Sequence, residues 1–208
     1  MTKVISRLYK SYDQAQQAVR DLEAAGVTNS DISIVANNSD DWYSNGGNGG
    51  TAKRVDRDRD GVDDRAEGAG TGAGIGAAIG GAAGLLTGLG LLAIPGVGPV
   101  VAAGWLVATA AGAAAGGLTG GIVGALTQAG VSDEDAHVYA EGVRRGGTLV
   151  TARVPDVTAS QLEMVLDRSA LRTADLRSSY SKGGWKTFDP AAKPYSADQV
   201  RKERSLYQ

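Results

Sequence analysis

Residues 132–154 read SDEDAHVYAEGVRRGGTLVTARV, and they predict a helix that is followed by a strand. Ser132 is a typical N-cap residue, and the acidic run DED that follows it suits the positive end of a helix dipole. Gly146 and Gly147 end this helix, whose apolar side chains share one face: Ala136, Tyr139, Ala140 and Val143. The stretch TLVTARV, residues 148–154, is rich in β-branched side chains and predicts a strand.

The N-terminal residues follow a related plan. KVISRLY, residues 3–9, predicts a strand, and Ser11 with Gln14 forms a capping box at the start of a helix. Gly26 ends that helix, and DISIVA, residues 31–36, predicts a second strand. These residues therefore indicate one strand–helix–strand unit before the centre of the chain.

A second unit of similar length follows the centre. After the strand at 148–154, Thr158 with Gln161 predicts another capping box, and residues 174–178 predict a last strand. Two such units predict an α+β fold, a split ferredoxin-like (βαβ…αβαβ) sandwich of four strands with helices on one face.

The segment between the two units contains no Asp, Glu, Lys or Arg from residue 68 to residue 132. Small residues recur in it with a period of four, which places them on one helix face and lets two backbones pack closely. IPGVGP, residues 94–99, ends the first helix and reverses the chain. The segment therefore predicts an inserted glycine-zipper α-helical hairpin that associates through two ladders: Gly68, Gly72, Gly76, Gly80, Gly84 and Gly88, then Gly104, Ala108, Gly112, Gly116, Gly120 and Gly124.

The surroundings of this hairpin are open to two interpretations. Each arm has about 25 residues, or about 38 Å of helix, which is enough to cross a hydrocarbon core of about 30 Å. The most apolar part is residues 85–107, so insertion of the tip alone is an alternative to a full span. The other interpretation is an assembly without lipid, in which the ladders are buried between subunits. A flexible linker is disfavoured, because such linkers lack regularly spaced Leu, Ile and Val.

Composition excludes several classes of function. The net charge is −2, and the 21 basic and 23 acidic residues are intermixed, which argues against nucleic acid as a partner. The absence of cysteine excludes disulfides, thiolate metal sites and thiol catalysis. The first residues lack the apolar region of a secretory signal, so we expect a cytoplasmic protein with membrane contact from the cytoplasmic side. The expected partners are further copies of the chain, as a homo-oligomer, and a lipid membrane.

One stretch has the pattern of a calcium-binding loop. DRDRDGVDDRAE, residues 56–67, fits D-x-D-x-D-G-x5-E, and calcium prefers such oxygen ligands. The alternative is a solvated acidic segment at the start of the next helix, because residues 37–51 are loop-like and Arg57 and Arg59 can neutralise the carboxylates. Calcium is the only cofactor that the sequence suggests, with these candidate ligands: Asp56, Asp58, Asp60, Val62 through its carbonyl, Asp64 and Glu67.

No arrangement of residues predicts catalysis. His137 is the only histidine, and it lies beside an acidic helix start, so a surface or capping role is favoured over a ligand or a base. In the tail, Ser196 with Gln199 predicts a short capped helix that ends in basic residues. This tail suits docking on another subunit, on a lipid interface or on its own domain.

These interpretations divide the chain into five segments. Residues 1–36 and 132–178 are the halves of the ferredoxin-like domain. The acidic linker with its calcium-loop-like motif covers residues 37–67, the hairpin covers residues 68–131, and the tail covers residues 179–208.

The sequence resembles bacterial general stress proteins of the heat-induced YflT type. The stretches that carry the resemblance, besides the N-terminal unit and residues 132–154, are DGVDDRAEGAGTGAGIGAAIGG (60–81), IPGVGPVVAAG (94–104) and DPAAKPYSADQVRKER (189–204). The resemblance implies induction under stress and no established enzymatic activity, and it supplies no catalytic residues.

We therefore expect a non-enzymatic stress-related protein that self-assembles through glycine-zipper helices, in or against a membrane. The alternatives are a calcium-responsive binding module, a homo-oligomer without membrane contact, and a regulatory domain that binds a small ligand.

Overall fold

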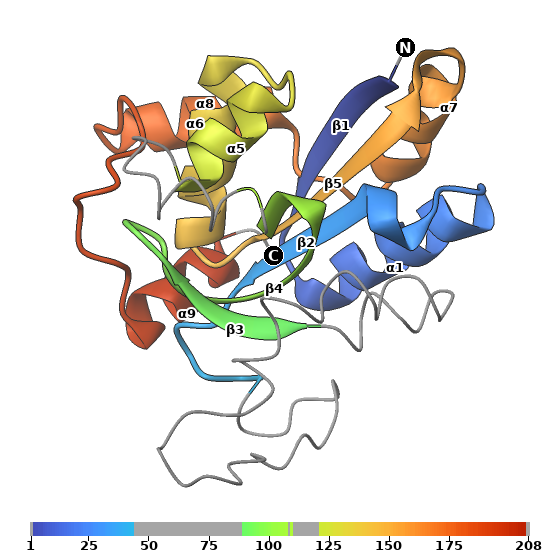
Figure 1. Ribbon diagram of the computed structural model, residues 1–208. Coiled ribbons are helices and arrows are strands. Elements are labelled where there is room, and N and C mark those ends of the chain that lie inside the picture. The colour runs from blue at the N-terminus through green and yellow to red at the C-terminus, as the bar shows by residue number, and fades with distance from the viewer. Residues whose placement is uncertain (1, 44–88, 108, 110–120, 207–208) are drawn as a thin grey trace, which may run out of the picture.

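A five-stranded sheet organises the part of the chain that the structure describes (Figure 1). This computed structural model describes residues 2–43, 89–107, 109 and 121–206. The elements are, in chain order, β1 (Thr2–Tyr9), α1 (Tyr12–Ala24), the 3-10 helix η1 (Asn29–Asp31), β2 (Ile32–Asn37), β3 (Gly90–Ile94), β4 (Gly98–Gly104), α5 (Gly121–Gln128), α6 (Asp133–Arg144), β5 (Thr148–Pro155), α7 (Asp156–Leu166), α8 (Thr173–Lys182) and α9 (Ala197–Ser205).

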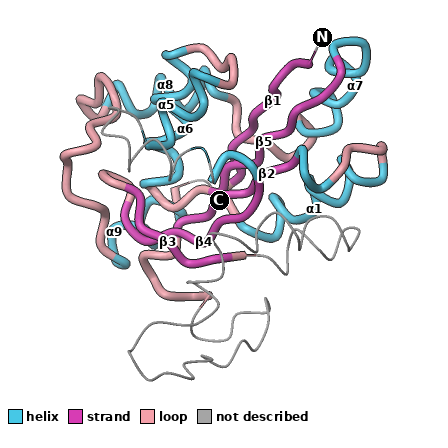
Figure 2. The backbone as a smooth tube through the Cα atoms, viewed as in Figure 1, coloured by secondary structure: helices cyan, strands magenta, loops and turns pink. Residues whose placement is uncertain are grey.

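The strand order is β1-β5-β2-β4-β3, and every neighbouring pair is antiparallel (Figure 2). Ala152 of β5 is opposite both Ile5 of β1 and Ile32 of β2. Because β5 is antiparallel to both neighbours, β1 and β2 run parallel to each other with β5 between them. This is a split βαβ unit, and it confirms the predicted α+β class.

Helices cover both faces of the sheet, because successive side chains of a strand point to opposite faces. Ile5, Ile34 and Val150 face a core that α1 and α7 complete. Leu8 and Leu149 face a second core, which includes residues of α5, α6 and α8. Figure 1 shows α1 and α7 on one side of the strands and α5, α6 and α8 on the other. The expectation of four strands with helices on one face is therefore wrong in both respects.

Residues 90–104 form a β-hairpin, β3 and β4, where the sequence predicted the meeting point of two helices. Gly96 and Gly98 have φ of 73° and 100°, and this left-handed conformation, which glycine adopts without strain, forms the tight turn. The valines of the segment favour a strand because they are β-branched. Val97 and Val100 are fully buried in the protein's own core, so the predicted helical tip is corrected to a pair of strands.

Gly104 ends β4 and is not part of a helical ladder. Its φ is 96°, and a Cβ there would lie 2.2 Å from the carbonyl oxygen of Ile32 and 2.6 Å from the Cα of Ser33. The glycine therefore permits the close approach of β4 to the start of β2. Of the other ladder residues, Gly124 lies in α5. The remainder lie outside the described residues: Gly68, Gly72, Gly76, Gly80, Gly84, Gly88, Ala108, Gly112, Gly116 and Gly120.

Three of the four N-cap residues that the sequence predicted cap a helix in the structure, and one does not. The Ser11 and Ser132 hydroxyls accept hydrogen bonds from the N–H groups of Gln14 and Asp135, and Ser196 forms a full capping box with Gln199. Thr158 is not an N-cap, because α7 begins two residues earlier behind Pro155.

The predicted last strand at residues 174–178 is part of helix α8. Before that helix, the chain makes one isolated bridge between Leu171 and Leu8 of β1. Leu176 and Tyr180 are both buried, and their spacing of i, i+4 places them on the same face of helix α8. None of the helices in the described ranges has both the length and the apolar character needed to cross a membrane.

Alkaline pH is expected to destabilise this fold. Tyr9 and Tyr139 are buried, and their hydroxyls donate to the carbonyl oxygens of Leu166 (3.1 Å) and Ser6 (2.8 Å). Burial raises the pKa of both phenols above the ordinary value of 10.0. Above about pH 10, the unfolded chain releases phenolic protons that the folded chain retains, so the free energy of unfolding falls as pH rises. Below that pH these groups contribute no pH dependence.

Urea unfolding at about pH 8 and about pH 11 measures this loss. Tyr9→Phe removes one of the two phenols and is expected to lose less stability between the two conditions than the wild type. Equal stability of the wild type at both pH values would contradict the prediction.

Candidate functional site

The predicted calcium ligands lie outside the described residues: Asp56, Asp58, Asp60, Val62, Asp64 and Glu67. Within the described ranges, no group of three or more His, Asp or Glu side chains is placed to hold a metal ion. Calcium binding therefore stays a prediction from the sequence, which calorimetry of the wild type against an Asp58→Ala, Asp60→Ala variant tests.

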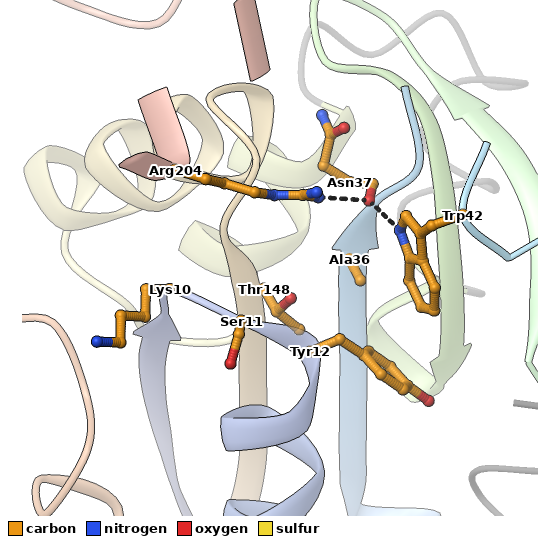
Figure 3. Close-up of a pocket in the computed structure, with 8 residues that line it drawn as sticks. All are labelled: Lys10, Ser11, Tyr12, Ala36, Asn37, Trp42, Thr148 and Arg204. Carbon is orange, nitrogen blue, oxygen red and sulfur yellow. Dashed lines mark hydrogen bonds between the residues drawn. The ribbon is translucent and has the colours of Figure 1, made fainter. Parts of the chain in front are cut away.

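A pocket of about 120 Å³ lies at one end of the sheet, where β1 and β2 end and β5 begins (Figure 3). The turn between β1 and α1, the end of β2, the start of β5 and helix α9 all contribute to it. The lining residues carry two basic side chains and no acidic one: Lys10, Ser11, Tyr12, Ala36, Asn37, Trp42, Thr148 and Arg204.

Thr148 provides an unused hydroxyl in this pocket. The residue is only 2% exposed, and its hydroxyl has no hydrogen-bond partner in the described part of the chain. Figure 3 shows it between Ser11 and Asn37, in the middle of the lining residues. The hydroxyl oxygen is not fully shielded from solvent, so it is available to a polar group that enters the pocket.

Aromatic rings form one wall of the pocket. The ring centroids of Tyr12 and Trp42 are 4.8 Å apart, and Tyr43 packs edge-on against Trp42. The indole N–H of Trp42 donates to the backbone oxygen of Asn37 at 2.8 Å, which fixes the orientation of the ring.

Helix α9 brings Arg204 to the pocket. The guanidinium pairs with Asp40 (2.7 Å) and donates to the carbonyl oxygens of Gly146 (2.9 Å) and Asn37 (3.3 Å). Val200 of the same helix is fully buried. The tail was expected to dock on another subunit, on a lipid interface or on its own domain. Helix α9 docks on its own domain.

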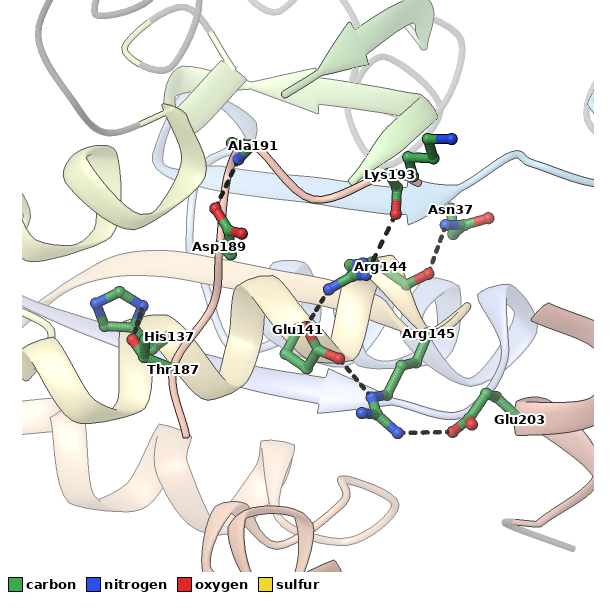
Figure 4. Close-up of polar contacts among 10 residues, drawn as sticks. All are labelled: Asn37, His137, Glu141, Arg144, Arg145, Thr187, Asp189, Ala191, Lys193 and Glu203. Carbon is green, nitrogen blue, oxygen red and sulfur yellow. Dashed lines mark hydrogen bonds and ion pairs between the residues drawn. The ribbon is translucent and has the colours of Figure 1, made fainter. Parts of the chain in front are cut away.

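A buried carboxylate holds the tail against α6 (Figure 4). Glu141 is 1% exposed and accepts from Arg145 at 2.7 Å and from Arg144 at 3.2 Å. Arg145 also pairs with Glu203 of α9, while Arg144 donates to the carbonyl oxygen of Lys193. The cluster joins α6 to two points of the C-terminal segment, so its role is structural.

His137 lies at a second pocket of about 300 Å³ between α5, α6 and the tail. Its Nδ1 is 3.0 Å from the Thr187 hydroxyl, and its Nε2 is 3.7 Å from a carboxylate oxygen of Asp133, one turn earlier on α6. These contacts tie the tail to the start of α6. The N-cap of α6 is Ser132, so His137 holds the tail and does not cap the helix.

The sequence did not single out the first pocket. Ser11 was identified only as a helix cap, and Thr148 only as a strand residue. Lys10 directly before a capped helix was the available signal, but Trp42, Thr148 and Arg204 join it only through the fold.

Residues 4–89 match the family model described as the heat-induced stress protein YflT domain. The match confirms the resemblance to YflT-type general stress proteins over these residues, which make up less than half of the chain. No curated protein and no solved structure matches the chain.

Proposed function

We propose that the chain is a non-catalytic stress-related protein that assembles with copies of itself. The observation that carries the proposal is the exposed edge strand β3, which lies within the charge-free segment. The match of residues 4–89 to the heat-induced stress protein YflT domain supports the stress-related part of the proposal.

The two edges of the sheet differ in their protection against pairing. β1 carries Lys3 and Arg7, which form ion pairs with Glu163 and Asp167, and Leu171 bonds to its outer side. Charged side chains and such cover are the usual means by which edge strands avoid other chains.

β3 has none of this protection in the described part of the chain. Its sequence GLLAI contains no charge, and it pairs only with β4. Leu91 on this strand is 52% exposed. An apolar edge with free backbone groups favours pairing with a second strand, and a second copy of this chain provides an identical one.

The composition around β3 lowers the cost of such a contact. No Asp, Glu, Lys or Arg occurs between Glu67 and Asp133. Two copies that meet through this segment therefore remove none of its side-chain charges from water. We also propose that this charge-free segment contacts a membrane, as its composition predicts. Flotation with lipid vesicles tests it separately from self-assembly.

Leu91→Lys is expected to reduce the size of the assembled particle, because a lysine on the edge strand opposes pairing with another copy. Light scattering of the purified full chain measures the molar mass. Leu206→Lys is the matched control, since Leu206 is also an exposed leucine (67%) but lies at the end of α9. Equal masses for both variants and the wild type would remove β3 from the proposal.

A further inference from the structure

In the pocket at the end of the sheet, one backbone acceptor is already in use and one hydroxyl is unpaired. The backbone oxygen of Asn37 already accepts from both Trp42 and Arg204. The Thr148 hydroxyl, by contrast, has no partner among the described residues. This hydroxyl is able to donate to a ligand that accepts hydrogen bonds.

The start of α1 adds further donors. The Ser11 hydroxyl accepts from Gln14 N–H, and Ala15 N–H bonds to the Ser11 carbonyl oxygen. The N–H groups of Tyr12 and Asp13 have no partner within the described ranges. A helix start with free N–H groups is a favourable place for an anion, and α1 is 13 residues long.

Charge in the lining agrees with an anion. Lys10 makes no ion pair with any residue that the structure describes. Asp40 lies nearby, but Arg204 pairs with it at 2.7 Å, and Asp13 at the start of α1 is exposed. No carboxylate lines the pocket itself.

Size limits the ligand. Pockets for drug-sized molecules measure about 300–1,000 Å³, and this one is about 120 Å³. A tetrahedral oxyanion fits this space, and the Tyr12–Trp42 wall offers a surface for a small organic group attached to it.

We propose that this pocket binds a phosphoryl group, either as free phosphate or as the phosphate of a small ester. The Thr148 and Ser11 hydroxyls and the N–H groups of Tyr12 and Asp13 donate to its oxygens, and Lys10 balances its charge. The proposal concerns a separate site and does not depend on self-assembly.

Calorimetric titration of the full chain at low ionic strength tests the proposal, with inorganic phosphate and phenyl phosphate as the two probes and chloride as the salt control. Saturable binding of at least one probe is expected. Tighter binding of phenyl phosphate would identify an ester as the natural source, and equal or tighter binding of inorganic phosphate would identify the free anion.

Two variants locate the site. Thr148→Val keeps the shape of the side chain and removes only the unpaired hydroxyl, so the strand is expected to fold, and circular dichroism checks this. Because a hydrogen bond to a charged group is lost, the dissociation constant is expected to rise about tenfold or more. Lys10→Gln is expected to weaken binding, whereas Lys182→Gln on α8 is the matched control and is expected to bind as the wild type does.

The absence of saturable binding by both probes overturns the proposal. So does a dissociation constant that Thr148→Val leaves unchanged.

Discussion

Gly104→Ala is expected to destabilise the fold by about 3–5 kcal/mol, because two costs add at this position. The first is the left-handed backbone, with φ of 96°, which an L-residue adopts at a cost of about 1–2 kcal/mol. The second is overlap, since the new Cβ would lie 2.2 Å from the carbonyl oxygen of Ile32. This oxygen and the Cα of Ser33, at 2.6 Å, both belong to the backbone of β2, so the overlap is removed only if the two neighbouring strands shift apart.

Gly26→Ala separates the two costs. Gly26 ends α1 with a similar φ of 91°, but a Cβ there meets nothing within 4 Å. Its substitution is therefore expected to cost only about 1–2 kcal/mol. Urea unfolding of both variants and the wild type gives the two values. Equal losses would contradict the close approach of β4 to β2.

Glu141→Ala is expected to cost about 3 kcal/mol of folding stability. The carboxylate is 1% exposed, and its removal leaves Arg144 and Arg145, each 16% exposed, without their shared partner. Breaking a buried ion pair costs about 3–5 kcal/mol, because the remaining charge is desolvated without compensation. The value here lies at the low end, because Arg145 retains Glu203 and contacts the Tyr180 ring.

Glu163→Ala is the matched control for this prediction. Its pair with Lys3 is on the surface, with side-chain exposures of 29% and 51%, and such pairs contribute less than about 1 kcal/mol. The free energy of unfolding of both variants is measured in the same urea series. A loss for Glu141→Ala as small as that for Glu163→Ala would show that the cluster is unimportant for the fold.

The sequence predicted those helices and strands whose signals lie within the element itself. The strand TLVTARV became β5, and the helix that Ser132 caps became α6, because capping and side-chain periodicity act within one element. The predicted helices do not form over residues 90–104, since glycines at a period of four are compatible with a helix face as well as with turns and close strand contacts. Gly96, Gly98 and Gly104 all adopt positive φ, and composition does not reveal this.

The candidate site was less predictable than the fold. Lys10 and Ser11 are adjacent in the sequence, but Thr148 and Arg204 reach them only after β5 inserts between β1 and β2 and α9 folds back. A hydroxyl without a partner is a property of the packed structure. No pattern in the sequence distinguishes Thr148 from Thr151, the other threonine of its strand.

Self-assembly is the central claim, and the molar mass of the purified wild-type chain tests it most directly. Light scattering over a series of protein concentrations, in buffer and in detergent, measures this mass. We expect a particle with a multiple of the single-chain mass of 21.2 kDa. A single species of 21.2 kDa at every concentration and in both solvents would contradict the claim.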